Sequence, residues 1–279
     1  MKIDTLAIVG VGLMGASVGA AALAKGVARQ VIGVDTSIKH LESAFRNRSI
    51  TAVASHVDLA VRESDFVVVC TPVDSIANLV VEASRCAEPH AVITDVGSTK
   101  RRIVEAVEKL APSARYVGSH PMAGSEKKGP DFARNDLFDN RPVILTCTNR
   151  TDPKITQLVT DFWNALGSRV VTMTPEEHDA AVAAVSHLPH AVSAALAGCT
   201  DLNLVPVSAG GWRDTTRVAG AGPGIWTPIF RENREAVIAA LDHFSDHLAG
   251  FRRFLEADDG PGITAWLVDA KRVRDALGS

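Results

Sequence analysis

The chain has few cysteines, and their placement follows no known pattern. Only four occur in 279 residues, without a C-x-x-C pair and without the spacing of metal ligands. A disulfide framework or a cysteine-based metal site is therefore not expected. Scattered, reduced core cysteines favour a cytoplasmic protein.

Charge imbalance, internal repeats and low-complexity segments are also missing. The 29 basic and 32 acidic side chains leave a net charge of −3, which gives no electrostatic reason to expect a nucleic-acid partner. One uncharged run, residues 5–24, could pass for a signal peptide or a membrane span. Its glycines and β-branched first part favour a strand, a turn and a helix instead, so we expect no membrane partner.

As far as residue 174, short apolar runs rich in β-formers alternate with amphipathic helical stretches. This alternation predicts an α/β fold of Rossmann type, a doubly wound parallel sheet with helices on both faces. The expected strands lie within residues 5–12, 30–35, 65–72, 91–98, 115–119, 142–148 and 169–174.

After residue 174 the pattern becomes helical throughout. Thr174, Pro175 and Glu177 fit a capping box that opens a helix about twice the mean length, and Pro189 should kink it. We therefore predict a dinucleotide-binding domain at 1–174 and an all-helical substrate and dimerisation domain at 175–279. Long apolar helix faces suggest a homodimer.

The sequence GVGLMG places three glycines in the G-x-G-x-x-G pattern between a strand and a helix, as a dinucleotide site requires. Asp35 ends the second strand, where a carboxylate can accept both ribose hydroxyls and repels a 2′-phosphate. This predicts NAD rather than NADP, although Lys39 is near. The expected cofactor-binding residues are Gly10, Gly12, Leu13, Met14, Gly15, Asp35, Thr71 and Pro72.

Ligands of doubly wound sheets lie beyond the carboxyl ends of the strands. The segments TPVDS, VGSTK and SHPMAGSEKKG follow three predicted strands there. Ser98 and His120 could thus converge beside a nicotinamide. A histidine near neutral pKa can accept the proton of an alcohol while hydride leaves its carbon.

Five sequence blocks occur in this order and at suitable separations along the chain: GVGLMGAS, DVGSTK, GSHPMAGSEKKG, SHLPH and GGWRDTTRVAGAGP. Together they strongly resemble the prephenate/arogenate dehydrogenase family of tyrosine biosynthesis. The resemblance implies oxidation of a ring alcohol by NAD+ with loss of the ring carboxylate as CO2. One departure is GAGPGIW before Trp226, where the family commonly has a Ser/Asn-Asp-Pro step, so this loop is expected to differ in shape. No regulatory domain is expected after the helices.

The resemblance also implies roles for single residues. His120 polarises or deprotonates the ring hydroxyl, and Ser98 bonds near that hydroxyl and helps to orient the histidine. Arg217 pairs with a substrate carboxylate, as a planar guanidinium can do bidentately. The substrate pocket is expected to contain His187, His190, facing the substrate, and Trp226.

Prephenate carries a keto group where arogenate carries an ammonium. Glu126 could pair with that ammonium, whereas His190 suits a keto acid. We expect prephenate, with arogenate as a second substrate; an arogenate-specific dehydrogenase is the alternative. Another hydroxyacid dehydrogenase would carry a lysine and an asparagine where SHLPH stands. A non-catalytic NAD-binding sensor would need neither Ser98 nor His120 nor Arg217 together. A metal is not predicted, because neither His187 with His190 nor His243 with His247 has a third ligand pattern.

Overall fold

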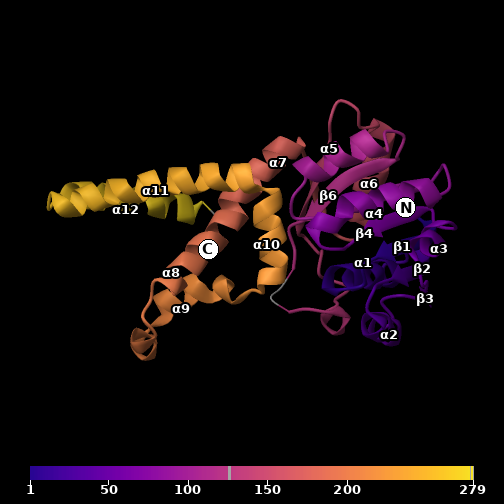
Figure 1. The fold of residues 1–279 in the computed structure, drawn as a ribbon, viewed down its shortest axis with the longest axis horizontal. Coiled ribbons are helices and arrows are strands. Elements are labelled where there is room, and N and C mark those ends of the chain that lie inside the picture. The colour runs from indigo at the N-terminus through magenta and orange to yellow at the C-terminus, as the bar shows by residue number, and fades with distance from the viewer. Residues whose placement is uncertain (125–126, 277, 279) are drawn as a thin grey trace. The chain divides into compact units, whose positions relative to one another are not determined.

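The computed structural model describes residues 1–124, 127–276 and 278. Within these residues eight strands form one sheet in the order β3-β2-β1-β4-β5-β6-β7-β8 (Figure 1). They are β1 Ile3–Val9, β2 Ala28–Val34, β3 Ala52–Val53, β4 Phe66–Val69, β5 Val92–Asp95, β6 Tyr116–Pro121, β7 Pro142–Thr146 and β8 Arg169–Met173. The predicted strands are present, and the two-residue β3 was not predicted.

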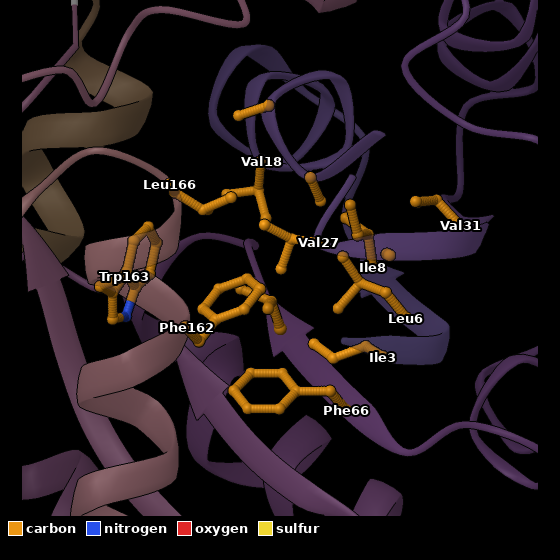
Figure 2. Close-up of a cluster of buried hydrophobic side chains, with 14 of the residues drawn as sticks. Ile3, Leu6, Ile8, Val18, Val27, Val31, Phe66, Phe162, Trp163 and Leu166 are labelled. Carbon is orange, nitrogen blue, oxygen red and sulfur yellow. The ribbon is translucent and has the colours of Figure 1, made fainter. Parts of the chain in front are cut away.

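Both faces of the sheet are covered, which is why the central strands are apolar throughout. Along β1, Leu6 and Ile8 belong to one buried cluster, whereas Ala7 and Val9 belong to a second cluster on the opposite face. The first cluster contains stacked rings of Phe66 and Phe162, with centroids 4.5 Å apart (Figure 2). The predicted doubly wound arrangement is confirmed.

Different helices supply the side chains of the two clusters. The first cluster draws on α1 Leu13–Ala24, α2 Ile38–Arg46 and α6 Pro153–Ala165. The second draws on α3 Val57–Val61, α4 Val73–Cys86 and α5 Arg101–Leu110. Residues 5–24 thus form most of β1, the glycine turn and α1 inside the sheet domain, as the strand–turn–helix interpretation predicted.

One pair of strands departs from the predicted parallel sheet. β7 runs antiparallel to β6, with His120 opposite Ile144. In the described residues of this connection, 122–124 and 127–141, there is the short 3₁₀ helix η1 Pro130–Phe132 and no crossover helix, so β7 begins at the end of the sheet where β6 finishes. This keeps the β6–β7 connection beside the carboxyl ends of the other strands.

The chain after β8 is helical, as predicted. It forms α7 Pro175–Val182, η2 Ala183–His187, α8 Leu188–Gly198, η3 Leu202–Val207, α9 Gly210–Thr216, η4 Arg217–Gly220, α10 Pro223–Glu232, α11 Arg234–Glu256 and α12 Gly260–Asp275. The predicted capping box is present, since Thr174 and Glu177 exchange hydrogen bonds with each other's backbone N–H.

The irregularity around Pro189 is a π turn, η2, upstream of the proline. Proline cannot donate to the carbonyl four residues before it, and a wider turn accommodates this loss. The run Pro175–Gly198 is long and apolar enough to cross a membrane by length and composition, a test that core helices of soluble proteins also pass. Here it contains three buried histidines, His178, His187 and His190.

Two compact units are present, Met1–Asn233 and Arg234–Ser279. The first includes α7 to α10: Asp179 of α7 bonds to the start of α5, and Ile229 of α10 belongs to the second core cluster. The second consists of α11 and α12, where Trp266 packs against His247 and Phe251. The division at residue 174 stays a prediction.

Candidate active site

The turn after β1 has the backbone that a dinucleotide site needs. Gly10 has φ +93°, and a Cβ there would lie 2.8 Å from the carbonyl oxygen of Cys70. A Cβ on Gly15 would lie 2.0 Å from the carbonyl oxygen of Gly10, so only glycine lets α1 approach the turn. Gly12 has open space at its Cβ position and caps α1 without a side chain. The helix N-terminus is therefore open to a pyrophosphate.

Asp35 lies at the end of β2 and faces this turn. Its carboxylate accepts hydrogen bonds from the backbone N–H of Val11, at 2.7 Å, and of Ser37, at 2.8 Å. His40 Nδ1 lies 3.5 Å away. The side chain keeps 12% exposure, so further lone pairs remain for a ribose.

The other expected cofactor residues occupy the neighbouring strand ends. Leu13 lines the large cleft described next, and Met14 packs against the first core cluster. Thr71 accepts a hydrogen bond from the Ser75 hydroxyl, and Pro72 caps α4. These positions are compatible with a dinucleotide bound across the carboxyl edge of the sheet.

A cleft of about 1250 Å³ opens at this edge. Ser98 comes to it from the loop after β5, and His120 from β6 itself rather than from the following loop. His187 and Trp226 line it from the helical segment. The structure thus brings together four of the predicted substrate and catalytic residues with Leu13 of the glycine turn.

His120 is held by a chain of buried hydrogen bonds. Its Nδ1 lies 2.8 Å from Nε2 of His178, and Nδ1 of His178 lies 2.8 Å from the Asp179 carboxylate. That carboxylate also accepts the backbone N–H groups of Lys100 and Arg101, at the start of α5. Nε2 of His120 is the ring nitrogen left for a ligand.

The surroundings keep these histidines neutral. Burial, followed by the nearby His178, Lys100 and His187, lowers the pKa of His120 well below its ordinary value of 6.5. Burial likewise lowers the pKa of His178, against the hydrogen bond to Asp179. At neutral pH, His120 is therefore unprotonated and able to act as a base.

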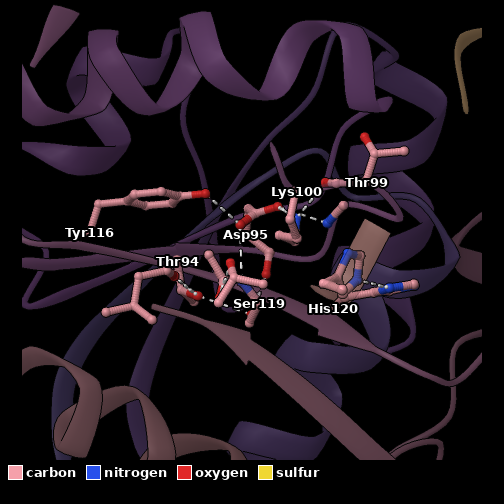
Figure 3. Close-up of polar contacts among 12 residues, drawn as sticks. Thr94, Asp95, Thr99, Lys100, Tyr116, Ser119 and His120 are labelled. Carbon is pink, nitrogen blue, oxygen red and sulfur yellow. Dashed lines mark hydrogen bonds and ion pairs between the residues drawn. The ribbon is translucent and has the colours of Figure 1, made fainter. Parts of the chain in front are cut away.

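Beneath the cleft lies a buried ion pair between Lys100 and Asp95, both fully inaccessible to solvent. Asp95 also accepts hydrogen bonds from the Tyr116 hydroxyl, at 2.9 Å, and from the Ser119 backbone N–H, at 3.1 Å. Figure 3 shows Asp95 between Tyr116 and Lys100, with Ser119 next to it. This network fixes β5 to β6 next to His120.

The two histidines of SHLPH have different surroundings. His187 lines the cleft, and Asn233 Nδ2 lies 3.1 Å from its Nδ1. Burial lowers the pKa of His187 to about 4, against the attraction of Asp179. His190 is absent from the described lining residues; its ring is stacked on Trp226, with centroids 3.5 Å apart. The position of Trp226 in the cleft thus depends on His190.

Besides His190, Arg217 is a predicted substrate residue that is not among the described residues that line the cleft. It begins η4 with an exposed side chain. Glu126 lies outside the described residues. The GAGPGIW loop starts α10, with Gly222 as its N-cap and Pro223 at the first helical position.

Sequence reasoning missed His178, Asp179, Lys100, Asp95 and Asn233. One pattern could have pointed to Lys100, because a lysine at the N-cap of a helix opposes the helix dipole and needs another reason to be there. The pair His178–Asp179 follows the capping box directly, where polar residues are usually exposed. Its burial depends on how α7 packs against α5, which the local sequence does not encode.

Acid should unfold this protein because of its buried histidines. The pKa values of His120, His178 and His187 are all lowered from 6.5 in the folded state, so the unfolded chain binds more protons as pH falls. Their contribution is complete above pH 6.5 and is lost progressively below it.

We expect the urea midpoint to fall between about pH 7.5 and about pH 5. The variant His187→Gln should reduce this change of the urea midpoint with pH, and the control His56→Gln, at an exposed histidine, should not. An equal midpoint at both pH values would contradict the expectation.

The fold and this site together define the class of the protein, a dinucleotide-dependent dehydrogenase. Two family models match the chain: "Prephenate dehydrogenase, nucleotide-binding domain" over residues 18–172, and "Prephenate dehydrogenase, dimerization domain" over residues 174–269. Together they cover most of the sheet domain and the helices after it.

Individual relatives agree with the family models. Prephenate dehydrogenase of Bacillus subtilis (strain 168) is 33% identical, over 98% of this chain and 76% of its own. Cyclohexadienyl dehydrogenase of Zymomonas mobilis is 31% identical, over 98% and 95%. The crystal structure of prephenate dehydrogenase from Aquifex aeolicus, in complex with hydroxyphenyl propionate and NAD+, superposes with a TM-score of 0.93 at 30% identity, covering 99% of both chains.

The chain belongs to the prephenate dehydrogenase family. The resemblance drawn from the five sequence blocks is thereby confirmed. Membership in this family disfavours the two alternatives, a non-catalytic NAD-binding sensor and another hydroxyacid dehydrogenase.

Proposed function

We propose that this protein oxidises and decarboxylates prephenate with NAD+, as a step of tyrosine biosynthesis. The observation that carries the proposal is His120, which is neutral, buried and held by His178 in the cleft beside the glycine turn. The Aquifex aeolicus relative was solved with NAD+ and hydroxyphenyl propionate, which supports NAD+ as the cofactor and an aromatic or ring-bearing carboxylic acid as the ligand of the cleft.

His120 would take the proton of the ring hydroxyl through Nε2. NAD+, when bound, would supply in its nicotinamide the acceptor for the hydride that leaves the same carbon. The ring carboxylate departs as CO2 and leaves its bonding pair in the ring, which becomes aromatic. The oxygen ends as a phenol, so the proton held by His120 returns to it. Ser98, on the same cleft wall, would bond near this oxygen.

The glycine turn and Asp35 would hold the cofactor. The open N-terminus of α1 fits a pyrophosphate, and the carboxylate of Asp35 fits two ribose hydroxyls. A 2′-phosphate would meet this carboxylate, which supports NAD over NADP.

Prephenate is the proposed substrate in preference to arogenate. Hydroxyphenyl propionate, bound in the Aquifex aeolicus relative, has a carboxylate side chain without an amino group. The cleft also presents Lys127, Lys128 and Arg141, which suit the two carboxylates that prephenate and arogenate share. Arg217 and, for arogenate, Glu126 remain proposed substrate contacts, as do His187, His190 and Trp226.

We also propose a cytoplasmic homodimer with a substrate domain from residue 175 onward. The family model over 174–269 describes a dimerization domain. Val185, Leu202 and Val207 are 70%, 84% and 79% exposed, which is costly for apolar side chains in water. A second copy would cover such surfaces.

The test is NADH formation by the purified protein with prephenate and with arogenate, each offered with NAD+ and with NADP+. We expect the highest kcat/KM with prephenate and NAD+. A higher value with arogenate would reverse the substrate proposal, and a higher value with NADP+ would reverse the cofactor proposal. No turnover of either substrate would overturn the function itself.

A further inference from the structure

Two residues, His178 and Asp179, connect His120 to the start of α5, and the mechanism above assigns no proton transfer to either of them. Both are buried, with His178 at 0% and Asp179 at 3% exposure. A buried polar chain of this kind is expensive unless every group has a partner.

The proton on each bond of this chain can be assigned from chemistry. The Asp179 carboxylate accepts N–H groups from Lys100, at 2.8 Å, and from Arg101, at 3.1 Å, at the positive end of α5. Burial alone would raise the pKa of Asp179, but the hydrogen bonds from His178 and from these two amides lower it. Asp179 is therefore an anion and can only accept.

The donor and acceptor atoms of the two histidine rings follow from this anion. His178 must place its proton on Nδ1, which faces Asp179 at 2.8 Å. In a neutral ring this leaves Nε2 of His178 as an acceptor. Nδ1 of His120, 2.8 Å away, must then carry the proton of His120.

We propose that His178 and Asp179 are positioning residues that fix His120 as the Nδ1–H tautomer, with the lone pair of Nε2 directed to the substrate. The inference rests on the proposed function for its catalytic meaning. The tautomer itself is a property of the protein without substrate.

Asp179 is also connected to His187, the second histidine among the described residues that line the cleft. The backbone carbonyl of Asp179 accepts a hydrogen bond from Asn233 Nδ2 at 2.8 Å, and the same amide group lies 3.1 Å from Nδ1 of His187. Both histidines that line the cleft are thus tied to one turn of α7. The carboxylate holds His120 through His178, and the carbonyl holds Asn233 beside His187.

The first experiment is NMR of the full chain labelled with ¹⁵N-histidine, which distinguishes the protonated from the unprotonated ring nitrogen. Comparison with His120→Asn assigns the signals of His120. We expect Nδ1 protonated and Nε2 unprotonated at neutral pH. A proton on Nε2 of His120 would overturn the inference, whatever the activity of the protein.

The second experiment compares two substitutions of His178. His178→Phe keeps a ring but removes both bonds, and we expect kcat to fall about 100-fold with KM for NAD+ unchanged. His178→Gln offers an amide N–H to Asp179 and an amide oxygen to His120, and it should recover most of kcat and the Nδ1–H signal.

Equal losses in both variants, with an unchanged tautomer of His120, would reduce His178 to a packing residue and overturn the proposal. Thermal unfolding midpoints verify that each variant is folded, and the NMR result on the parent chain stands if His178→Phe does not fold. If the tautomer is as expected and neither substrate turns over, the proposed function fails and the positioning inference survives.

Discussion

Replacing His120 with asparagine should lower kcat about 100- to 10,000-fold, the range over which a general base contributes. Asparagine can still bond to His178 but has no basic nitrogen for the substrate hydroxyl. The parent, whose base has a lowered pKa, should retain kcat as pH falls from neutral to 6.5.

Cofactor binding provides the control for this experiment. The glycine turn and Asp35 do not depend on the imidazole, so the Kd for NAD+ from fluorescence titration should be unchanged in His120→Asn. His90→Asn, at an exposed histidine, should leave both kcat and Kd as they are. Undiminished turnover in His120→Asn would remove the base from the mechanism.

The largest expected loss of stability follows from Lys100→Met. Methionine fills a similar volume but leaves the Asp95 carboxylate without a cation at a site with no solvent exposure. Breaking a buried pair by removing one partner costs about 3–5 kcal/mol. We expect the free energy of unfolding, measured by urea denaturation, to fall by this amount.

Two further variants separate charge from packing at this site. Lys109→Met alters an exposed lysine in the same helix and should change the free energy of unfolding by less than about 0.5 kcal/mol. The double variant Lys100→Met/Asp95→Asn removes the stranded charge and should regain part of the loss. A loss in Lys100→Met no larger than in Lys109→Met would show that the ion pair has no stabilising role.

Most of the sheet could be predicted because its determinants are local. β1, β4 and β5 are short apolar runs that end at glycine, proline or polar residues, and the crossovers have helical periodicity. The antiparallel β7 could not be predicted in this way. Its strand has the same apolar composition as a parallel one, and its direction goes with a connection whose described residues, 122–124 and 127–141, form no crossover helix.

The residues of the candidate site also differ in whether local sequence could predict them. Ser98, His120, His187 and Trp226 stand in recognisable blocks, and the structure brings them to one cleft. His178 and Asp179 could not be predicted, because their role depends on a contact between α7 and α5 that joins residues 78 and 79 positions apart. A kink was predicted at Pro189, and the structure has instead the π turn η2 in the residues before the proline.

The capping of α5 by Asp179 has a consequence for exchanging parts between relatives. The Asp179 carboxylate caps the N-terminus of α5, which belongs to the nucleotide-binding segment. Asp179 itself lies beyond residue 174, within the segment that the dimerization model matches. A chimaera joined at that boundary would pair α5 and His120 from one parent with a cap and a ring from another. Such hybrids should work only when the junction is moved past residue 179, or when both parents carry a histidine followed by an aspartate there.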